Sequence, residues 1–164
     1  MTFALTPPRF RRVAVVALAL LAVIIVSGAA VRLTGSGLGC DDWPRCSETA
    51  LVDVSSKHAA IEQGNRFFTG AVGIAVIACV LGALRRAPRR RDLTVLAWLL
   101  VIGVLANAVL GGISVKVDLH PLAVQGHMLL SMGLIVAGAV LVRRSGEPDG
   151  VPRRPTVSAP TWLR

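Results

Sequence analysis

The stretch VAVVALALLAVIIVSGAAV, residues 13–31, has no charged side chain and decides the kind of fold. As a helix it is long enough to cross the ~30 Å hydrocarbon core of a bilayer. Three more apolar runs follow at about residues 67–84, 93–115 and 122–142, and none has Asp, Glu, Lys or Arg in its interior. In lipid a backbone must satisfy its own hydrogen bonds, so each run is expected to be helical. The sequence therefore predicts an all-α fold, an integral membrane four-helix bundle over residues 13–142.

The composition is that of a membrane protein rather than a nucleic-acid-binding one. Hydrophobic residues make up 54% of the 164 residues and charged residues 16%, a bias that a bilayer-embedded bundle needs. The net charge is +9, but the chain has no Tyr and only 4% aromatic residues. Its basic residues flank the apolar runs, which is typical of residues that orient a membrane protein. We expect the lipid bilayer as a partner and no nucleic acid.

The charges between the runs predict the orientation. Segments 1–12, 85–92 and 143–164 carry 13 basic and three acidic residues, a net charge of +10, whereas the other two loops carry five basic and six acidic residues, a net charge of −1. The positive-inside rule then places both termini in the cytoplasm, in a multi-pass protein of the plasma membrane. The N-terminus (1–12) and a proline-rich tail (143–164), expected to be disordered, lie inside, and a Cys-bearing loop (32–66) lies outside.

The first run has an alternative interpretation as a cleaved signal peptide. Arg9, Arg11 and Arg12 resemble its basic region, and Ser27-Gly28-Ala29-Ala30 resembles a cleavage site. The run is long for that purpose, and cleavage would leave the topology of the rest unchanged.

The outer loop contains Cys40 and Cys46, with Pro44 between them and a glycine-rich approach before them. These residues favour a tight turn that brings the two cysteines within disulfide range, in a compartment where disulfides persist. A structural disulfide, a redox-active pair and a metal site are the three interpretations. The metal site is the least favoured because no His or third Cys accompanies the pair in the loop. Cys79, in the apolar middle of the second run, is expected to be a small buried hydrophobe.

The segment before residue 67 predicts that the second helix projects beyond the bilayer core. Ser55 is the expected N-cap, and a helix from there to Leu84 would present one polar face carrying His58, Glu62, Asn65, Arg66 and Thr69. One interpretation is a local Glu62–Arg66 ion pair. The other is a proton-handling Glu62 in a membrane cavity, with Arg66 facing an anionic substrate group. Deeper in the helix a stripe of small residues favours close packing or leaves room for a flat cofactor: Ala71, Ala75, Ala78 and Gly82.

Two polar residues lie inside the third and fourth runs. Asn107 precedes Gly111-Gly112 and is expected to bond across the bundle. Pro121 suits a helix start, and His127 follows two turns later. A buried His of this kind either bonds to a neighbouring helix or supplies Nε2 to haem iron. His120, in the loop, is a weaker candidate.

Several segments, in order along the chain, resemble those of haem A synthase, the cytochrome oxidase assembly enzyme. The loop stretch from Arg32 to Cys40, followed by Asp42-Trp43-Pro44 and Cys46, is similar to the first outer loop of that family. Weaker resemblances follow at Glu62-Gln63-Gly64-Asn65-Arg66, at the stretch from Asn107 to Val115, and at Pro121 through His127 with Ser131. Together they cover roughly residues 12–142.

The resemblance implies a membrane oxidoreductase that converts a methyl group of haem O to the formyl group of haem A. It implies an essential carboxylate at Glu62, a disulfide between Cys40 and Cys46, and a haem ligand at His127. Haem b or haem O is the expected cofactor, and its iron the expected metal. The expected cofactor-binding residues are His127, Arg66, Asn65 and Arg32, with Arg66 or Arg32 pairing with propionates.

The chain departs from the family pattern at three points. It has four apolar runs where the family has two four-helix bundles, Asn65 stands where many members have His, and Asn107 stands where Gln is frequent. Bis-His ligation within one chain would then need His58 or His120 to lie deeper. A homodimer, or a partner that supplies a complementary four-helix half, would restore eight helices.

Two other functions are compatible with the same residues. A quinone-linked thiol-disulfide oxidoreductase would use four helices and outer cysteines, although a single C-x5-C lacks the second pair needed for relay. A non-catalytic haem-binding or oxidase assembly subunit would bind haem without turnover.

Overall fold

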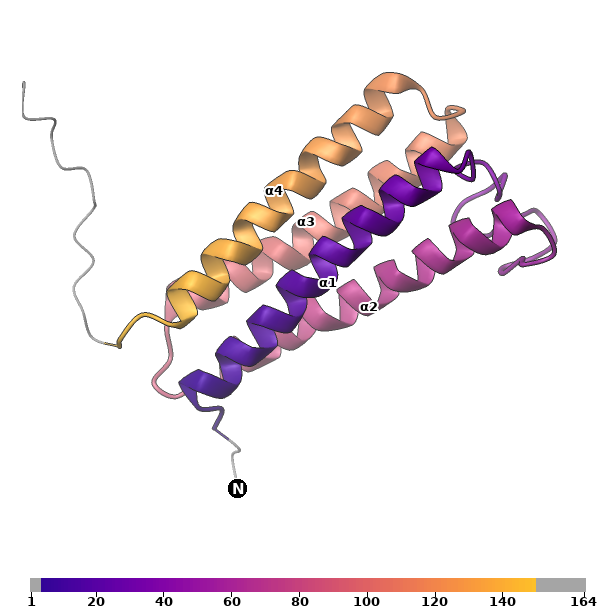
Figure 1. The fold of residues 1–164 in the computed structure, drawn as a ribbon. Helices are drawn as coiled ribbons and strands as arrows, with labels where there is room; N and C mark the ends of the chain where they lie inside the picture. The colour runs from indigo at the N-terminus through magenta and orange to yellow at the C-terminus, as the bar shows by residue number, and fades with distance from the viewer. Residues whose placement is uncertain (1–3, 150–164) are drawn as a thin grey trace, which may run out of the picture.

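The computed structural model describes residues 4–149 and consists of four long helices (Figure 1). They are α1 (Pro7–Leu33), α2 (Lys57–Arg85), α3 (Arg91–Lys116) and α4 (Pro121–Ser145). Each is long and apolar enough to cross a membrane. The described residues form no β-strand beyond an isolated bridge between Leu5 and Arg86. The predicted all-α four-helix membrane bundle is therefore confirmed.

The helices begin where local hydrogen bonds dictate. Ser56, and not Ser55, caps α2, because its hydroxyl accepts from the backbone N–H of Ala59 at 3.1 Å. The N–H of Ser55 instead donates to Asp53 Oδ1 at 2.8 Å, which holds Ser55 in the preceding turn and contributes to lowering the pKa of Asp53. The predicted cap is thus wrong by one residue. α4 begins at Pro121 as predicted.

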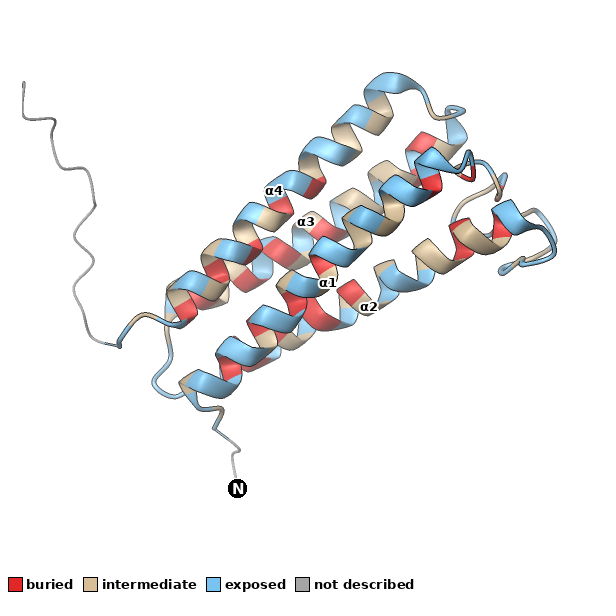
Figure 2. Cartoon of the chain, viewed as in Figure 1, coloured by how far each residue is buried: buried red, intermediate tan, exposed pale blue. Residues whose placement is uncertain are grey.

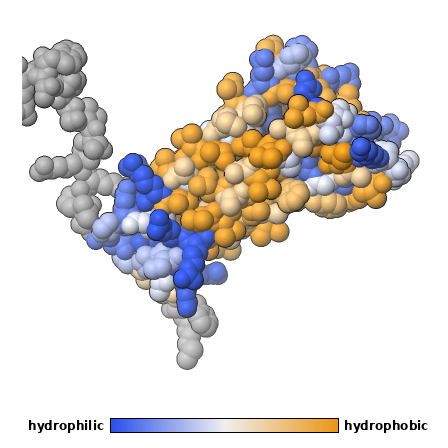
Figure 3. Space-filling model, in the orientation of Figure 1, coloured by the Kyte–Doolittle hydropathy of each residue, from blue (hydrophilic) through white to orange (hydrophobic). Residues whose placement is uncertain are grey.

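The four helices form a ring. α1 packs against α2 and α4, α3 packs against the same two helices, and the diagonal pairs have no Cα atoms within 8 Å of each other. The described N-terminal and C-terminal segments lie at one end of the bundle, together with the turn between α2 and α3, and the disulfide loop lies at the other (Figure 1). Figure 3 shows an apolar band between two hydrophilic ends, the pattern of a protein that crosses a bilayer.

The hydrophobic core occupies the half of the bundle near the termini, which we call the core half. Its large side chains are fully buried: Phe10, Leu93, Leu100 and Leu141. Small residues between them permit close helix approach. A Cβ at Gly82 would lie 3.1 Å from the Phe10 ring, and Ala75 is buried, so this part of the small-residue stripe serves packing. Cys79 is fully buried, as predicted.

The other half of the bundle has no such core. No residue is buried within 22–30 of α1, 64–71 of α2, 105–111 of α3 or 121–130 of α4, and Figure 2 shows buried positions interrupted there. We call these four stretches the open half. They lie at the same depth of the bundle, on the side of the disulfide loop.

The tail begins later than predicted. Residues 143–145 belong to α4, and the following residues fold back onto the turn between α2 and α3. Asp149 pairs with Arg86 at 2.8 Å, and Glu147 lies 3.6 Å from Arg90. The part of the predicted tail from residue 150 onward lies outside the described residues.

Candidate functional site

The first polar cluster joins α3 and α4 at the inner boundary of the open half. His127 Nδ1 lies 3.1 Å from the carbonyl oxygen of Asn107, and Asn107 Nδ2 donates to Ser131 Oγ at 2.9 Å. The Ser131 hydroxyl donates in turn to the carbonyl of His127 at 2.8 Å. We call His127, Asn107 and Ser131 the α3–α4 cluster. The expectation that Asn107 bonds across the bundle is confirmed.

The α3–α4 cluster fixes the tautomer of His127. A carbonyl oxygen can only accept, so Nδ1 must carry the proton and donate it to Asn107. Nε2 then bears a lone pair, and it has no hydrogen-bond partner among the described residues. An imidazole whose Nδ1–H is held by a carbonyl and whose Nε2 is free is the usual form of a histidine metal ligand.

Gly111 makes this position of His127 accessible. A Cβ at Gly111 would lie 3.2 Å from Cε1 and 3.4 Å from Nδ1 of the imidazole, closer than ordinary contact. A larger residue there would push the ring away from α3. No sequence motif assigns this role to Gly111, and the only signal for it is a glycine one helical turn after Asn107.

The second polar cluster is at the start of α2. Glu62 is 5% exposed, and its Oε1 pairs with Arg66 at 2.7 Å. The predicted local ion pair is therefore confirmed. The second carboxylate oxygen accepts from the backbone N–H of Cys40 at 2.9 Å. Glu62 thus has partners on its own helix and on the outer loop.

The disulfide loop is clamped onto α2 by the same ion pair. Cys40 and Cys46 form a disulfide. Arg66 donates to the carbonyls of Asp42 at 3.0 Å and Arg45 at 2.9 Å, both between the two cysteines. Every contact of the Glu62–Arg66 pair with the loop therefore falls on the ring that the disulfide closes.

The loop also packs closely on two helices through glycines. A Cβ at Gly112 would lie 2.5 Å from the Trp43 indole, so this ring lies on the backbone of α3. A Cβ at Gly39 would collide with the backbone of His58 at the start of α2. The loop therefore bridges the start of α2 and the end of α3.

The remaining predicted site residues are not gathered into one cluster. Asn65 accepts from the Ser27 hydroxyl at 2.7 Å, which joins α1 and α2. His58 bonds with buried Ser36 at 2.9 Å, and His120 caps α4. Arg32 is exposed. Within residues 4–149, no hydrogen bond or ion pair connects the Glu62–Arg66 pair with the α3–α4 cluster.

The side chains available as metal ligands limit which kind of metal-containing group the site could hold. No three His, Cys, Asp or Glu side chains in the described part of the chain lie close enough together to hold an ion. A metal bound through His127 must therefore bring most of its donors with it. A porphyrin does so, because its four nitrogens leave only axial positions for the protein.

These features define a multi-pass membrane protein, built as one bundle with a clamped disulfide loop and a histidine whose Nε2 is free. Residues 11–163 match the family model COX15-CtaA, described as cytochrome oxidase assembly protein. The chain belongs to this family.

Curated relatives are named haem A synthase. The chain is 31% identical over 137 residues to that of Bacillus pumilus, which covers 80% of this chain and 44% of the relative. It is 29% identical over 130 residues to that of Exiguobacterium sibiricum, covering 76% and 44%. For Lysinibacillus sphaericus the identity is 30% over 125 residues, covering 73% and 39%. The chain spans less than half the length of these relatives.

Proposed function

We propose that this chain holds haem in its open half and acts in haem A synthesis, as a haem A synthase-type oxidoreductase that oxidises a methyl group of haem O to the formyl group of haem A. The observation that carries the proposal is the geometry of His127. Its Nδ1 is bound to the Asn107 carbonyl and its Nε2 is free. It lies where the four helices bury none of their own residues. Membership of the oxidase assembly family supports the same assignment.

His127 is the residue that would ligate haem b or haem O. Bound haem supplies the redox chemistry through its iron. The tasks left to the chain are to bind the haem, to orient it and to exchange protons. Gly111 admits the imidazole, and the Asn107 carbonyl fixes its orientation. A carbonyl partner on Nδ1 also raises the basicity of the ligating nitrogen.

Glu62 is the group to which we assign proton transfer. Conversion of a methyl to a formyl group is an oxidation that removes hydrogen from the carbon, so protons must leave the site while an electron acceptor outside this chain takes the electrons. A carboxylate near the reacting methyl group would accept such protons. Glu62 is the one buried acidic residue in the described chain, and it immediately precedes the open half on α2.

The structure favours Arg32 over Arg66 as a partner for the haem propionates. Arg66 already donates to Glu62 and to two loop carbonyls. Arg32 is exposed at the end of α1, and its guanidinium has no hydrogen bond or ion pair within residues 4–149. An uncommitted guanidinium at this depth suits a carboxylate that projects from the membrane.

The orientation proposed from the charges places the termini in the cytoplasm and the disulfide loop outside the plasma membrane. The described parts of all three basic segments lie at one end of the bundle (Figure 1), as the positive-inside rule requires. A disulfide at the opposite end is then on the oxidising side.

A second bundle completes the proposed assembly. His127 is the one histidine within the apolar runs, since His58 and His120 lie at the outer helix ends. Asn65 is engaged by Ser27. We propose that a second copy of the chain, or a complementary four-helix half, supplies further haem ligation. Native mass spectrometry of detergent-extracted protein distinguishes one chain, two copies and a heteromer.

The absorption spectrum of the purified protein tests haem binding. Expressed with ample haem, the wild type is expected to show Soret and α bands, and His127→Ala to lose them. His120→Asn is the matched control, because it removes a histidine but keeps a side chain able to cap α4, and it is expected to retain both bands. A colourless wild type that takes up no added haem would refute the proposal.

A non-catalytic haem-binding subunit is the second candidate function. The observation that favours it is that Asn65, whose amide is a poor iron ligand, is engaged by the Ser27 hydroxyl at 2.7 Å. Retained haem without conversion of haem O would support it. A quinone-linked thiol oxidoreductase is less well supported, because the third cysteine, Cys79, is buried in the core half.

A further inference from the structure

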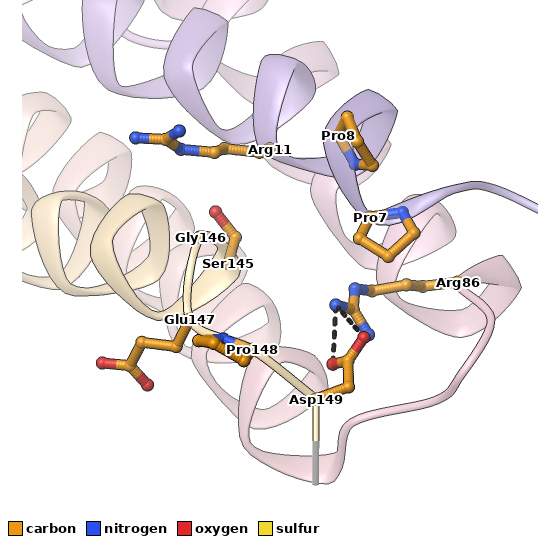
Figure 4. A pocket seen from close by; sticks show the side chains of 9 residues that line it. All are labelled: Pro7, Pro8, Arg11, Arg86, Ser145, Gly146, Glu147, Pro148 and Asp149. Carbon is orange, nitrogen blue, oxygen red and sulfur yellow. Dashed lines mark hydrogen bonds and ion pairs between the residues drawn. The ribbon is translucent and has the colours of Figure 1, made fainter. Parts of the chain in front are cut away.

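The arginines at the terminal end of the bundle fall into two groups. Two arginines of the turn between α2 and α3 have acidic partners: Arg86 pairs with Asp149 at 2.8 Å (Figure 4), and Arg90 pairs with Asp92 at 3.2 Å. Arg89 and Arg91 are exposed and have no ion pair within the described residues. Glu147, the third acidic residue at this end, lies within 4 Å of Arg90 and Arg143. The acidic side chains described at this end are thus all engaged.

Arg11 and Arg12 of α1 belong to the other group. Both are exposed, and neither has an ion pair or a side-chain hydrogen bond with residues 4–149. In Figure 4 the Arg11 side chain extends away from the Arg86–Asp149 pair, over the end of α4. A Cβ at Gly146 would lie 3.2 Å from Arg11 Nε, so the side chain rests on the glycine that ends α4.

A shallow, open groove along one face of α1 continues from these two arginines into the apolar band. Its volume is about 510 Å³, and it is lined by Pro8, Arg11, Arg12, Val15 and Val16. The two valines are exposed and lie in the first apolar run. A separate cavity of about 290 Å³ between α1 and the end of α4 shares Pro8 and Arg11.

We propose that this groove is a binding site for one anionic phospholipid, with its phosphate on Arg11 and Arg12 and an acyl chain along Val15 and Val16. A guanidinium forms strong, charge-assisted hydrogen bonds with phosphate. The arginine stems cover apolar surface while their charged heads reach the headgroup level. Because no carboxylate offsets these two charges, an anionic lipid is preferred over a zwitterionic one. This site is independent of the haem chemistry proposed above.

Native mass spectrometry of the protein in detergent, titrated with phosphatidylglycerol or phosphatidylcholine, tests the site. The wild type is expected to retain one phosphatidylglycerol in preference to phosphatidylcholine. The double variant Arg11→Gln/Arg12→Gln is expected to lose about tenfold or more in affinity for that lipid, since each arginine near a membrane surface contributes to anionic lipid binding. Val16→Trp, which fills the apolar part of the groove, is expected to weaken retention of phosphatidylglycerol although both arginines are intact.

The matched control is Arg89→Gln/Arg91→Gln, which removes the same charge from exposed positions at the same end. It is expected to change the affinity much less than the α1 pair does. Equal losses in the two double variants would mean diffuse attraction and would overturn the site. So would the absence of any preference for phosphatidylglycerol, or displacement of the lipid by millimolar inorganic phosphate. Circular dichroism of each variant verifies that the bundle is folded.

Discussion

The two halves of the bundle differ in what holds their helices together. In the core half, large side chains such as Phe10 and Leu100 are fully buried among alanines and glycines. In the open half no residue of the four stretches is buried, and the helix pairs are joined by polar contacts such as Ser27–Asn65 and Asn107–Ser131. One end of the bundle is completed by its own buried side chains, whereas at the other end no residue of the four stretches is buried.

The two halves of each helix also differ in whether they serve the stability of the bundle or its proposed function. Close packing in the core half fixes the helix positions, because few voids are tolerated in a protein interior. The helix positions in the open half follow from this packing, and hydrogen bonds there orient individual side chains. Substitutions in the core half should therefore act on folding, and those in the open half on ligand binding or on the outer loop.

The largest effect is expected from a cavity in the core half. Leu100→Ala should lower the free energy of unfolding by about 2–5 kcal/mol, because a fully buried leucine is truncated. Leu105→Ala, on the same helix but 63% exposed, should cost less than about 1 kcal/mol. Unfolding by SDS titration in mixed micelles measures both. Equal losses for the two leucines would remove the distinction between the halves.

A smaller effect is expected at the clamp on the disulfide loop. Arg66→Gln should cost about 2 kcal/mol, since it leaves the buried Glu62 carboxylate without its cation and frees two loop carbonyls. Hydrogen exchange at residues 40–46 should accelerate, whereas amides of the core half should keep their protection. Lys57→Gln, an exposed charge on the same helix, is the control. Unchanged exchange in the loop of Arg66→Gln would show that the disulfide alone holds it.

The helices and several contacts were predictable from the sequence because their causes are local. Uncharged runs must be helical in lipid, Pro121 starts a helix, and Glu62 and Arg66 are one turn apart on α2. An amide within the membrane must find a partner across the bundle, and Asn107 does so. Each of these conclusions depends on residues that are close in sequence or on the solvent alone.

The contacts that were missed depend on distances between helices. The fit of His127 against Gly111 and of Trp43 against Gly112 requires the separation of α3 from α4 and from the loop. The docking of Asp149 on Arg86 spans 63 residues. No periodicity or motif specifies such distances, so the glycines gave only a general signal of close approach.

The position of His127 provides a sharper test of the open half. Gly111→Ala should weaken haem binding by about tenfold, because an added methyl group pushes the imidazole off the Asn107 carbonyl. Gly133→Ala is the control, since a Cβ there meets nothing within 4 Å. Titration of haem into the apoprotein, followed at the Soret band, gives both affinities. If both variants bind haem like the wild type, the α3–α4 cluster does not orient the ligand.

The smallest effect is expected at the outer end of α2, where two adjacent serines have different contacts. Ser56→Ala should cost about 1 kcal/mol in unfolding free energy, because the hydroxyl that accepts from Ala59 N–H is lost. Ser55→Ala should cost less, because Ser55 bonds only with the exposed Asp53 of the preceding turn and does not cap α2. The same SDS titration compares them. A larger loss of unfolding free energy for Ser55→Ala than for Ser56→Ala would indicate that the helix begins one residue earlier. The polar face that carries Glu62 would then be shifted.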